Sequence, residues 1–272
     1  MPKRKPHTTG RAKKPTTESE SSTIYFYYPN ESPYGIFCQW YSSRITIPTT
    51  SLTFLTTHST TTTTTTTTPS PSTILSSYAP SLTFTCAEQF YMFCKSLYFS
   101  NAQTCRLVLS TSDPAQQKKF GQKVVGYNEW KWTHVKSRVC RVGNWYKFVQ
   151  NGNEDRGMRG VLLGTGDREL AEAARRDRVW GIGYNAEEAE VNRENWGENR
   201  LGRALMCVRE RLKVMVQMEV EGNVVAWDWD GQVEGEDDED EHEYVDKEGD
   251  DEGLGGGGIE FVEGQSVEEG LT

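Results

Sequence analysis

The chain's most informative stretch reads LAEAARRDRVWGIG at residues 170–183 and, after a short gap, WGENRLGRALMCVRERL at residues 196–212. It combines the carboxylates of Glu172 and Asp177 with two tryptophans, a glycine-rich turn and an Asn-Arg pair. This mixture is typical of a pocket wall that holds a flat ring and a phosphate group. We therefore expect the chemistry of the protein to lie here, with the rest of the chain supporting it.

The two carboxylates are Glu172 and Asp177, and both lie in a strongly charged segment. Two solvated surface charges would be the ordinary interpretation of such a segment. The pair Trp180-Gly181 favours a site instead, because a tryptophan offers a stacking surface and a glycine allows close approach of the backbone. Cleavage of a glycosidic bond needs a carboxylate beside an oxocarbenium-like centre and a proton route to the leaving group.

Four further residues are candidate ligands for a phosphate. Asn199 and Arg200 open a predicted helix, and backbone N–H groups at a helix start together with an arginine form a natural phosphate site. Lys95 and Lys147 lie on aromatic-rich predicted helices, from which they can reach the same pocket. The alternative is that both lysines lie at the surface, as most lysines do.

Glu88 is the first carboxylate of interest along the chain. It follows Thr85 at the spacing of a Thr-x-x-Glu capping box, so its side chain is expected to close the start of a helix. The functional alternative is a carboxylate held in its ionised form at the helix N-terminus by the helix dipole. The residues alone leave both interpretations open.

Hydrophobic spacing and capping residues predict a mostly helical chain with few strands. The predicted strands are residues 23–28 and one or two segments within 214–229. The predicted helices begin near residues 85, 100, 113, 132, 158 and 199, and the last of them ends near residue 213. Residues 168–177 suit either a helix or a short buried strand.

Composition predicts one folded domain, residues 24–227, between biased segments. Residues 1–23 form a basic polar tail, residues 228–272 an acidic Gly-rich tail, and residues 49–80 a Thr-, Ser- and Pro-rich insert with nine consecutive threonines. Such segments have too few apolar groups to pack, so we expect disordered tails and a flexible insert. About 150 residues remain, which is enough for a substantial core.

Charge is divided unevenly along the chain. The acidic tail holds 19 Asp and Glu residues and one Lys, while the whole chain has a net charge of −9. The folded part is therefore mildly basic, which suits an anionic small molecule. Its basic residues form no stripe with interleaved aromatics, so a nucleic-acid partner is not expected.

Cysteine and histidine usage argues against disulfides and metals. None of the six cysteines forms a CxxC pair and the four histidines are scattered, so we expect reduced thiols and no metal site. Residues 1–23 contain no apolar stretch and no apolar run of 18 residues occurs, so we expect neither a secretory leader nor a membrane span. We therefore expect an intracellular, cytoplasmic protein, with a nuclear address as the alternative suggested by the basic PKRK and RAKK clusters.

Taken in order, the segments of this chain resemble the NADAR family, also called YbiA-like proteins. The resemblance covers about residues 25–213, apart from the insert. It rests on the two segments quoted first and on YGIFCQW (34–40), FTCAEQFYMFCK (84–95), DPAQQKKFGQKV (113–124), WTHVKSRVC (132–140), KFVQN (147–151) and LLGTG (162–166).

The resemblance implies a single compact α+β domain, predominantly helical with a small β-sheet, and no cofactor. It implies an N-glycosidase that acts on a phosphorylated N-riboside, either a ribosylamino-pyrimidine phosphate of riboflavin synthesis or an ADP-ribose-type substrate such as ADP-ribosylated guanine. The expected catalytic residues are Glu88, Asp177 and Glu172. The expected substrate-binding residues are Gln39, Lys95, Trp132, Lys147, Trp180, Gly181, Asn199 and Arg200.

The chain departs from the family pattern at two places. Where the family often has F-S-N-F, this chain has Phe37-Cys38-Gln39-Trp40, so the amide at Gln39 is one methylene longer. The insert also lengthens the distance along the chain to Glu88, although a long surface loop costs little additional closure entropy. These departures leave a second hypothesis open, a module that binds ADP-ribose or NAD without turning it over.

Overall fold

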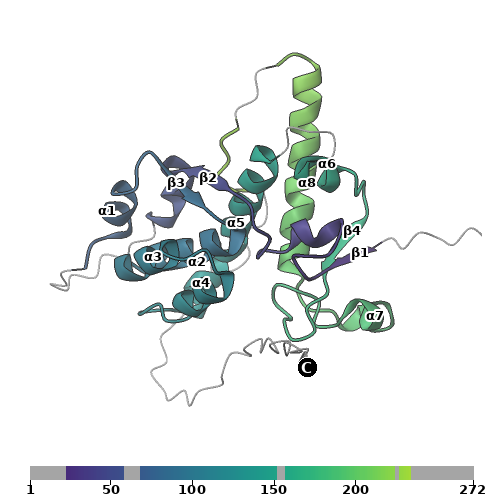
Figure 1. The fold of residues 1–272 in the computed structure, drawn as a ribbon, viewed down its shortest axis with the longest axis horizontal. Helices are drawn as coiled ribbons and strands as arrows, with labels where there is room; N and C mark the ends of the chain where they lie inside the picture. The colour runs from purple at the N-terminus through teal and green to yellow at the C-terminus, as the bar shows by residue number, and fades with distance from the viewer. Residues whose placement is uncertain (1–22, 58–67, 152–156, 224–226, 234–272) are drawn as a thin grey trace, which may run out of the picture.

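The computed structural model describes residues 23–57, 68–151, 157–223 and 227–233 (Figure 1). The tail predicted for residues 1–23 lies outside these residues except for Thr23, which belongs to the first strand. The nine threonines lie outside them except for Thr68. The predicted acidic tail lies outside them from residue 234 onward.

Helices dominate the described residues, and they confirm the predicted α+β class with few strands. The α-helices are α1 (Pro71–Ser76), α2 (Ala87–Tyr98), α3 (Ala102–Leu109), α4 (Pro114–Gly121), α5 (Glu129–Gln150), α6 (Met158–Leu163), α7 (Ala186–Ala189) and α8 (Arg200–Val220). Short 3-10 helices are η1 (Tyr34–Phe37), η2 (Thr49–Leu55) and η3 (Glu190–Asn195).

Four short strands form two separate pairs. β1 (Thr23–Phe26) pairs in parallel with β4 (Glu169–Glu172), so that Phe26 lies opposite Glu172. β2 (Ile45–Pro48) pairs antiparallel with β3 (Ser81–Phe84). The ambiguity over residues 168–177 is thus resolved in favour of a strand, because β1 supplies a hydrogen-bonding partner that helix propensity cannot outweigh.

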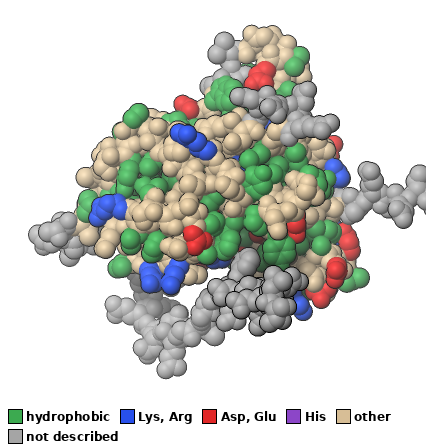
Figure 2. All heavy atoms as spheres, in the orientation of Figure 1, with side chains coloured by type: hydrophobic (Ala, Val, Ile, Leu, Met, Phe, Trp, Pro, Cys, Tyr) green, Lys and Arg blue, Asp and Glu red, His purple; other side chains and the backbone are tan. Residues whose placement is uncertain are grey.

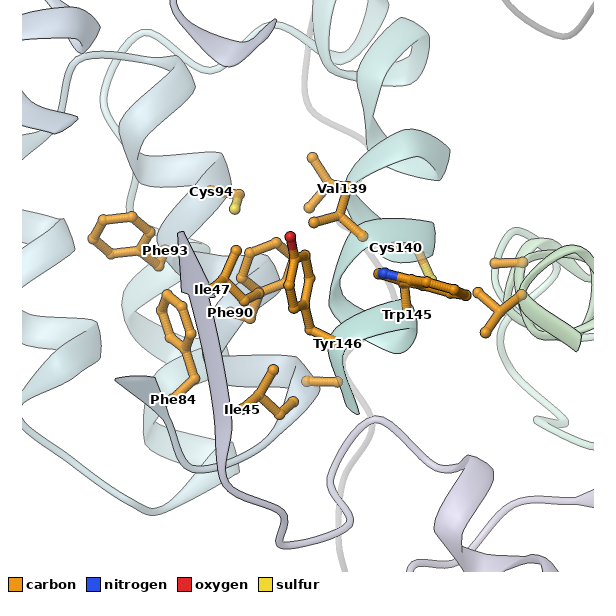
Figure 3. Packing of buried hydrophobic residues seen from close by; sticks show 14 of the residues in the cluster. Ile45, Ile47, Phe84, Phe90, Phe93, Cys94, Val139, Cys140, Trp145 and Tyr146 are labelled. Carbon is orange, nitrogen blue, oxygen red and sulfur yellow. The ribbon is translucent and has the colours of Figure 1, made fainter. Parts of the chain in front are cut away.

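Helix α5 lies between two halves of the molecule (Figure 1). On one side α2, α3 and α4 pack together with β2 and β3, and on the other α8 packs beside α6 and the β1–β4 pair. Figure 3 shows Trp145 and Tyr146 leaving α5 in opposite directions, so that adjacent residues fill the two halves of the core. Tyr146 lies near Phe90 and Ile47, and Trp145 points towards α8.

Aromatic side chains fill the core of the α2 half. Phe84, Phe90 and Phe93 are almost completely buried, with edge-to-face contacts at ring-centroid distances of 5.3 and 5.5 Å from Phe84. Gly143 allows this packing, because a Cβ there would lie 2.5 Å from Phe90 Cδ1. Burying three such rings contributes several kcal/mol of hydrophobic free energy, about 2 kcal/mol each.

Helix starts follow the predicted capping residues, with one correction. Asp113 caps α4 and accepts a hydrogen bond from Ala115 N at 2.9 Å, as Asp-Pro predicts. The predicted capping box of Thr85 and Glu88 is wrong. The N-cap is Cys86, and it is Gln89 whose side-chain oxygen accepts from Thr85 N at 2.7 Å. The Glu88 side chain therefore takes no part in capping α2.

The insert is more ordered than its composition predicts. Residues 49–57 and 68–80 contain η2 and α1, and Leu52 and Leu55 are buried in the core. The prediction of a flexible loop throughout 49–80 is thus wrong for these parts, because scattered leucine, isoleucine and phenylalanine side chains find apolar partners.

The predicted strands within 214–229 are also absent from the described residues, because α8 continues to Val220. The folded region then extends past the predicted boundary at 228, through a segment that we call the strap, residues 227–233. Trp229 of the strap is 8% exposed and contacts Trp145 edge-to-face at 5.6 Å. Strap carbonyls of Trp227 and Gly231 accept hydrogen bonds from Trp145 Nε1 and Arg141 Nε, both at 2.7 Å.

No helix among the described residues is long and apolar enough to cross a bilayer. On the face drawn in Figure 2, hydrophobic side chains gather towards the middle and most charged side chains lie near the rim.

Candidate active site

A cavity of about 140 Å³ lies where the α2 half and the β4–α8 half meet. Its wall is strongly aromatic, with three carboxylates and one lysine. It is lined by Tyr27, Tyr28, Pro29, Cys38, Gln39, Trp40, Glu88, Tyr91, Met92, Lys118, Glu172, Ala174, Asp177, Trp180 and Leu201.

The structure brings five of the predicted site residues to this one cavity. They come from three separate parts of the chain, of which the segment 170–183 supplies Glu172, Asp177 and Trp180. They are Gln39, Glu88, Glu172, Asp177 and Trp180. Their catalytic or binding roles remain predictions.

Glu88 projects from the first turn of α2 and is 8% exposed. Its backbone N–H donates to Gln39 O at 3.0 Å, which ties the start of α2 to the segment 38–40. Its Oε1 is buried and has no hydrogen-bond partner among the described residues. Burial raises the pKa of the Glu88 carboxyl to about 7, against the opposing effects of Lys118, a hydrogen bond from Trp40, and Lys95.

Glu172 ends β4, and its Oε2 is likewise buried without a hydrogen-bond partner among the described residues. Burial raises the pKa of its carboxyl to about 8; the negative charges of Asp177 and Glu88 act in the same direction, and Lys118 opposes them. A buried carboxyl near other negative charges retains its proton near neutral pH. A buried polar oxygen left unpaired is costly, so two such carboxyls on one cavity are typical of a functional site.

Asp177 is held differently from the other two carboxylates. Its Oδ1 accepts hydrogen bonds from Val179 N at 2.9 Å and Trp180 N at 2.8 Å, so a short turn fixes its direction. The same turn places Trp180 against Tyr91, with ring centroids 5.1 Å apart and the planes nearly perpendicular. The carboxylate and its neighbouring ring are therefore set by one local structure.

Gly181 and Asn199 support the cavity from behind, and neither lines it. A Cβ on Gly181 would lie 2.7 Å from Glu172 O and from Ala174 Cβ, so the glycine serves close packing of the chain on itself. The Asn199 side chain bonds to β4, with Nδ2 donating to Leu170 O at 2.8 Å and Oδ1 accepting from Glu172 N at 3.1 Å. Their predicted roles in substrate binding stay predictions.

The backbone donors at the start of α8, where a phosphate site was predicted, are engaged within the protein. The N–H groups of Asn199, Arg200 and Leu201 already donate to the carbonyls of residues 181, 179 and 180. The Arg200 guanidinium bonds to Ser137 Oγ at 3.1 Å and to the Glu198 carboxylate. Donors that are already engaged by the protein are not available to an anion.

Three further predicted ligands lie outside the cavity. Lys147 is completely buried, and its Nζ donates to Cys38 O at 3.0 Å; burial lowers its pKa to about 8. Lys95 lies 3.9 Å from the centre of the Tyr127 ring. Trp132 is buried, and its Nε1 donates to the hydroxyl of Tyr91 at 2.7 Å. Trp132 therefore acts on the cavity wall through Tyr91.

Sequence reasoning missed several lining residues, of which Lys118 is the most informative. Lys118, on α4, is the one cation among the described residues that line this cavity, and its charge acts on both Glu88 and Glu172. In the described part of the chain, no Asp or Glu side chain forms an ion pair with the Lys118 ammonium at a nitrogen–oxygen distance of 4.0 Å or less. Both Lys118 and Tyr91 lie in segments that carry the family resemblance, which was the signal that could have marked them, whereas Tyr27 lies in none of the quoted segments.

A second, wider cavity of about 490 Å³ adjoins the first. Four residues line both cavities, namely Tyr27, Tyr28, Ala174 and Asp177. The second cavity adds Arg175 and Arg176 together with Glu31, Asn185 and Glu187. A ligand too large for the first cavity thus has a polar extension available beyond Asp177.

Metal ligands do not converge in the described ranges. No group of three or more His, Cys, Asp or Glu side chains with metal-binding geometry is found among them. The six cysteines are free thiols, and burial raises the pKa of those at 38 and 140 to about 12.

Comparison with known proteins finds similar sequences and a similar solved structure. The chain is 34% identical over 129 residues to N-glycosidase R617 of Acanthamoeba polyphaga mimivirus, covering 47% of this chain and 74% of that protein. It is 27% identical over 190 residues to Riboflavin biosynthesis protein VVA0006 of Vibrio vulnificus, covering 70% of this chain but 38% of that protein. The NMR structure of the E. coli protein YbiA aligns with a TM-score of 0.48 at 20% identity, over 72% of this chain and 87% of that one.

The family model named NADAR domain matches residues 25–213, well over half of the chain. This range contains every residue that lines the first cavity. The chain belongs to the NADAR domain family.

Proposed function

We propose that this protein is an N-glycosidase that hydrolyses the bond between a ribosyl carbon and a base nitrogen in a phosphorylated N-riboside. The observation that carries the proposal is the convergence of Glu88, Glu172 and Asp177 on one aromatic cavity, with buried carboxyl oxygens left unpaired in two of them. The name of the mimivirus relative supports the reaction class.

The chemistry follows from the protonation of the carboxyls. The Glu88–Glu172 pair retains a proton near neutral pH, so one member can protonate the departing nitrogen as the C–N bond breaks. The other member, once ionised, accepts a proton from the water whose oxygen bonds to the ribosyl carbon. Asp177 lies beside both cavities, where its negative charge stabilises the ribosyl cation.

The remaining lining residues suit the two ends of such a substrate. Tyr91 and Trp180 supply aromatic surface for a planar base, and Lys118 supplies a positive charge. Arg175 and Arg176 in the second cavity are suited to phosphate oxygens. A ribosylamino-pyrimidine phosphate and an ADP-ribose-type compound both meet these requirements, and the name of the Vibrio relative favours testing the former first.

Product analysis by mass spectrometry tests the proposal. Wild-type protein incubated with a ribosylamino-pyrimidine phosphate should release the free pyrimidine and ribose 5-phosphate, while Glu88→Gln should lower the rate by about 10²-fold or more. Glu194→Gln, at an exposed residue outside both cavities, is the matched control and should keep the wild-type rate.

The outcomes separate the two hypotheses. A folded Glu88→Gln protein with the wild-type rate would contradict the proposed mechanism. Binding of ADP-ribose or NAD with every candidate substrate recovered unchanged would identify a non-catalytic reader instead.

A further inference from the structure

Asn199 has a backbone conformation that asparagine tolerates but most residues avoid. It precedes α8 with φ 50° and ψ 41°, in the left-handed region, and it is 6% exposed. A left-handed residue with a Cβ costs free energy, which the surrounding structure must offset. The hydrogen bonds of the Asn199 side chain offset this cost.

The amide of Asn199 completes the free edge of β4. On one edge of β4 the strand pairs with β1, and just beyond it Ala173 N donates to Phe26 O. Leu170 O and Glu172 N point to the other edge, because alternate residues of a strand direct their hydrogen-bonding groups the same way. There the Asn199 amide pairs with both groups, as a neighbouring strand would, at 2.8 and 3.1 Å.

Asn199 also joins β4 to the turn that carries Asp177. Its backbone N–H donates to Gly181 O at 3.3 Å, within the segment fixed by the Asp177 carboxylate. Gly202 allows α8 to begin this close to the strand, because a Cβ there would lie 2.0 Å from Leu170 O. One buried side chain and one N–H thus connect the two carboxylate-bearing segments.

We infer that Asn199 is a positioning residue, which fixes the Glu172 carboxyl relative to Asp177 and never contacts the substrate. This role replaces the substrate contact expected from the sequence. Its effect on rate depends on the proposed N-glycosidase function, whereas its effect on Glu172 does not.

The test uses two variants of the full chain. Asn199→Gly keeps the left-handed backbone at little cost and removes both side-chain hydrogen bonds. Asn199→Asp keeps the shape and the acceptor for Glu172 N but places a second oxygen against Leu170 O. For both we expect kcat to fall by about tenfold or more with KM changed much less, since small displacements of a catalytic group cost large factors in rate.

A titration of the Glu172 carboxyl carbon by NMR gives a readout that is independent of turnover. The carboxyl signal is assigned with Glu172→Gln, and its midpoint should move away from the wild-type value in both Asn199 variants. Asn128→Gly is the control, because Asn128 caps α5 through an exposed hydrogen bond to Lys131 N at 2.8 Å and lines neither cavity. It should leave both midpoint and kcat unchanged.

Circular dichroism first establishes which variants are folded. An unmoved Glu172 midpoint in a folded Asn199 variant would overturn the inference, whatever the activity. A moved midpoint in a protein that hydrolyses no N-riboside would leave the positioning role in place and refute the proposed function alone.

Discussion

Two sites of buried charge meet at the segment Cys38–Trp40, and they differ in what surrounds them. On the cavity side, Glu88 and Glu172 each keep a buried oxygen without a partner among the described residues. Behind the segment, the Lys147 ammonium donates to Cys38 O and lies 5.6 Å from the ring centres of Tyr41 and Phe148. All three residues were predicted from the sequence to lie in one site.

The comparison shows that burial of a charge does not by itself identify a functional group. Burial moves the pKa of all three groups towards neutrality. Only the carboxyls face a cavity that a ligand can enter, whereas Lys147 is sealed in the core. Access, together with an unsatisfied polar atom, is the more useful criterion.

The largest effect that would test this contrast is on turnover. Glu172→Gln should lower kcat by about 10²- to 10⁴-fold. The amide can neither protonate the departing nitrogen nor take a proton from the attacking water. Lys147→Met should keep kcat within about threefold of wild type, since it removes no group from the cavity. Steady-state kinetics on the folded variants measure kcat for each. An equal loss of kcat in the two variants would contradict the distinction between the two sites.

Stability should respond to Glu172 in a pH-dependent way. Its pKa rises from 4.5 to about 8 on folding, so between these values the native state binds more protons than the unfolded state. The free energy of unfolding therefore falls as pH rises through this range. At pH 9, Glu172→Gln should be more stable than wild type by on the order of 4 kcal/mol.

Urea denaturation across pH 5 to 9 gives this measurement. At pH 5, where the wild-type carboxyl is protonated in the native state, the two proteins should be nearly equal. A constant difference across the whole range would show that Glu172 does not titrate in the cavity.

The rate should also depend on pH in a defined direction. The proton of the Glu88–Glu172 pair is required for departure of the base, and the two pKa values lie at about 7 and about 8. We expect kcat to fall above pH 8 by about tenfold per pH unit as that proton is lost. If kcat instead rises between pH 7 and pH 9, neither Glu88 nor Glu172 is the group that protonates the departing base.

The smallest expected effect is the change in stability caused by Lys147→Met. The pKa of Lys147 falls from 10.5 to about 8 on folding, so between these values the unfolded state binds more protons and wild-type stability rises with pH. Lys147→Met lacks this rise, and at pH 7 it should be more stable than wild type by about 1 kcal/mol, after loss of the bond to Cys38 O. Chemical denaturation at pH 7 and pH 9.5 tests both statements.

The sequence predicted the elements with local signals well. Asp113-Pro114 marked the start of α4, and the hydrophobic spacing around Val139 marked α5 to within three residues of its start. The strand β4 stayed ambiguous because its partner β1 lies 146 residues away, and no local propensity records such a partner. The last turns of α8 were missed because valine and methionine suit strands as well as helices.

For the site, the sequence singled out the three carboxylates that line the cavity, and it did not predict how the other residues are arranged around them. Glu88, Glu172 and Asp177 were recognisable from their neighbours, whereas the exclusion of Lys147 and Asn199 from the cavity depended on long-range packing. Asn199 illustrates the reason, since its amide reaches Leu170 and Glu172, about 29 and 27 positions earlier in the chain. A helix start that looks free for phosphate in sequence can already be hydrogen-bonded to the fold.

The strap gives the molecule an optical signal of its own. Its Trp229 contacts Trp145 edge-to-face at 5.6 Å, and the Arg211 guanidinium lies 4.7 Å from the Trp229 ring, while Trp40 and Trp180 line the cavity. Two indoles at that distance couple their electronic transitions, so the near-ultraviolet circular dichroism of this pair reports whether residues 227–233 are docked. Quenching of Trp40 and Trp180 fluorescence would report ligand entry separately, and the two events can be followed in one cuvette.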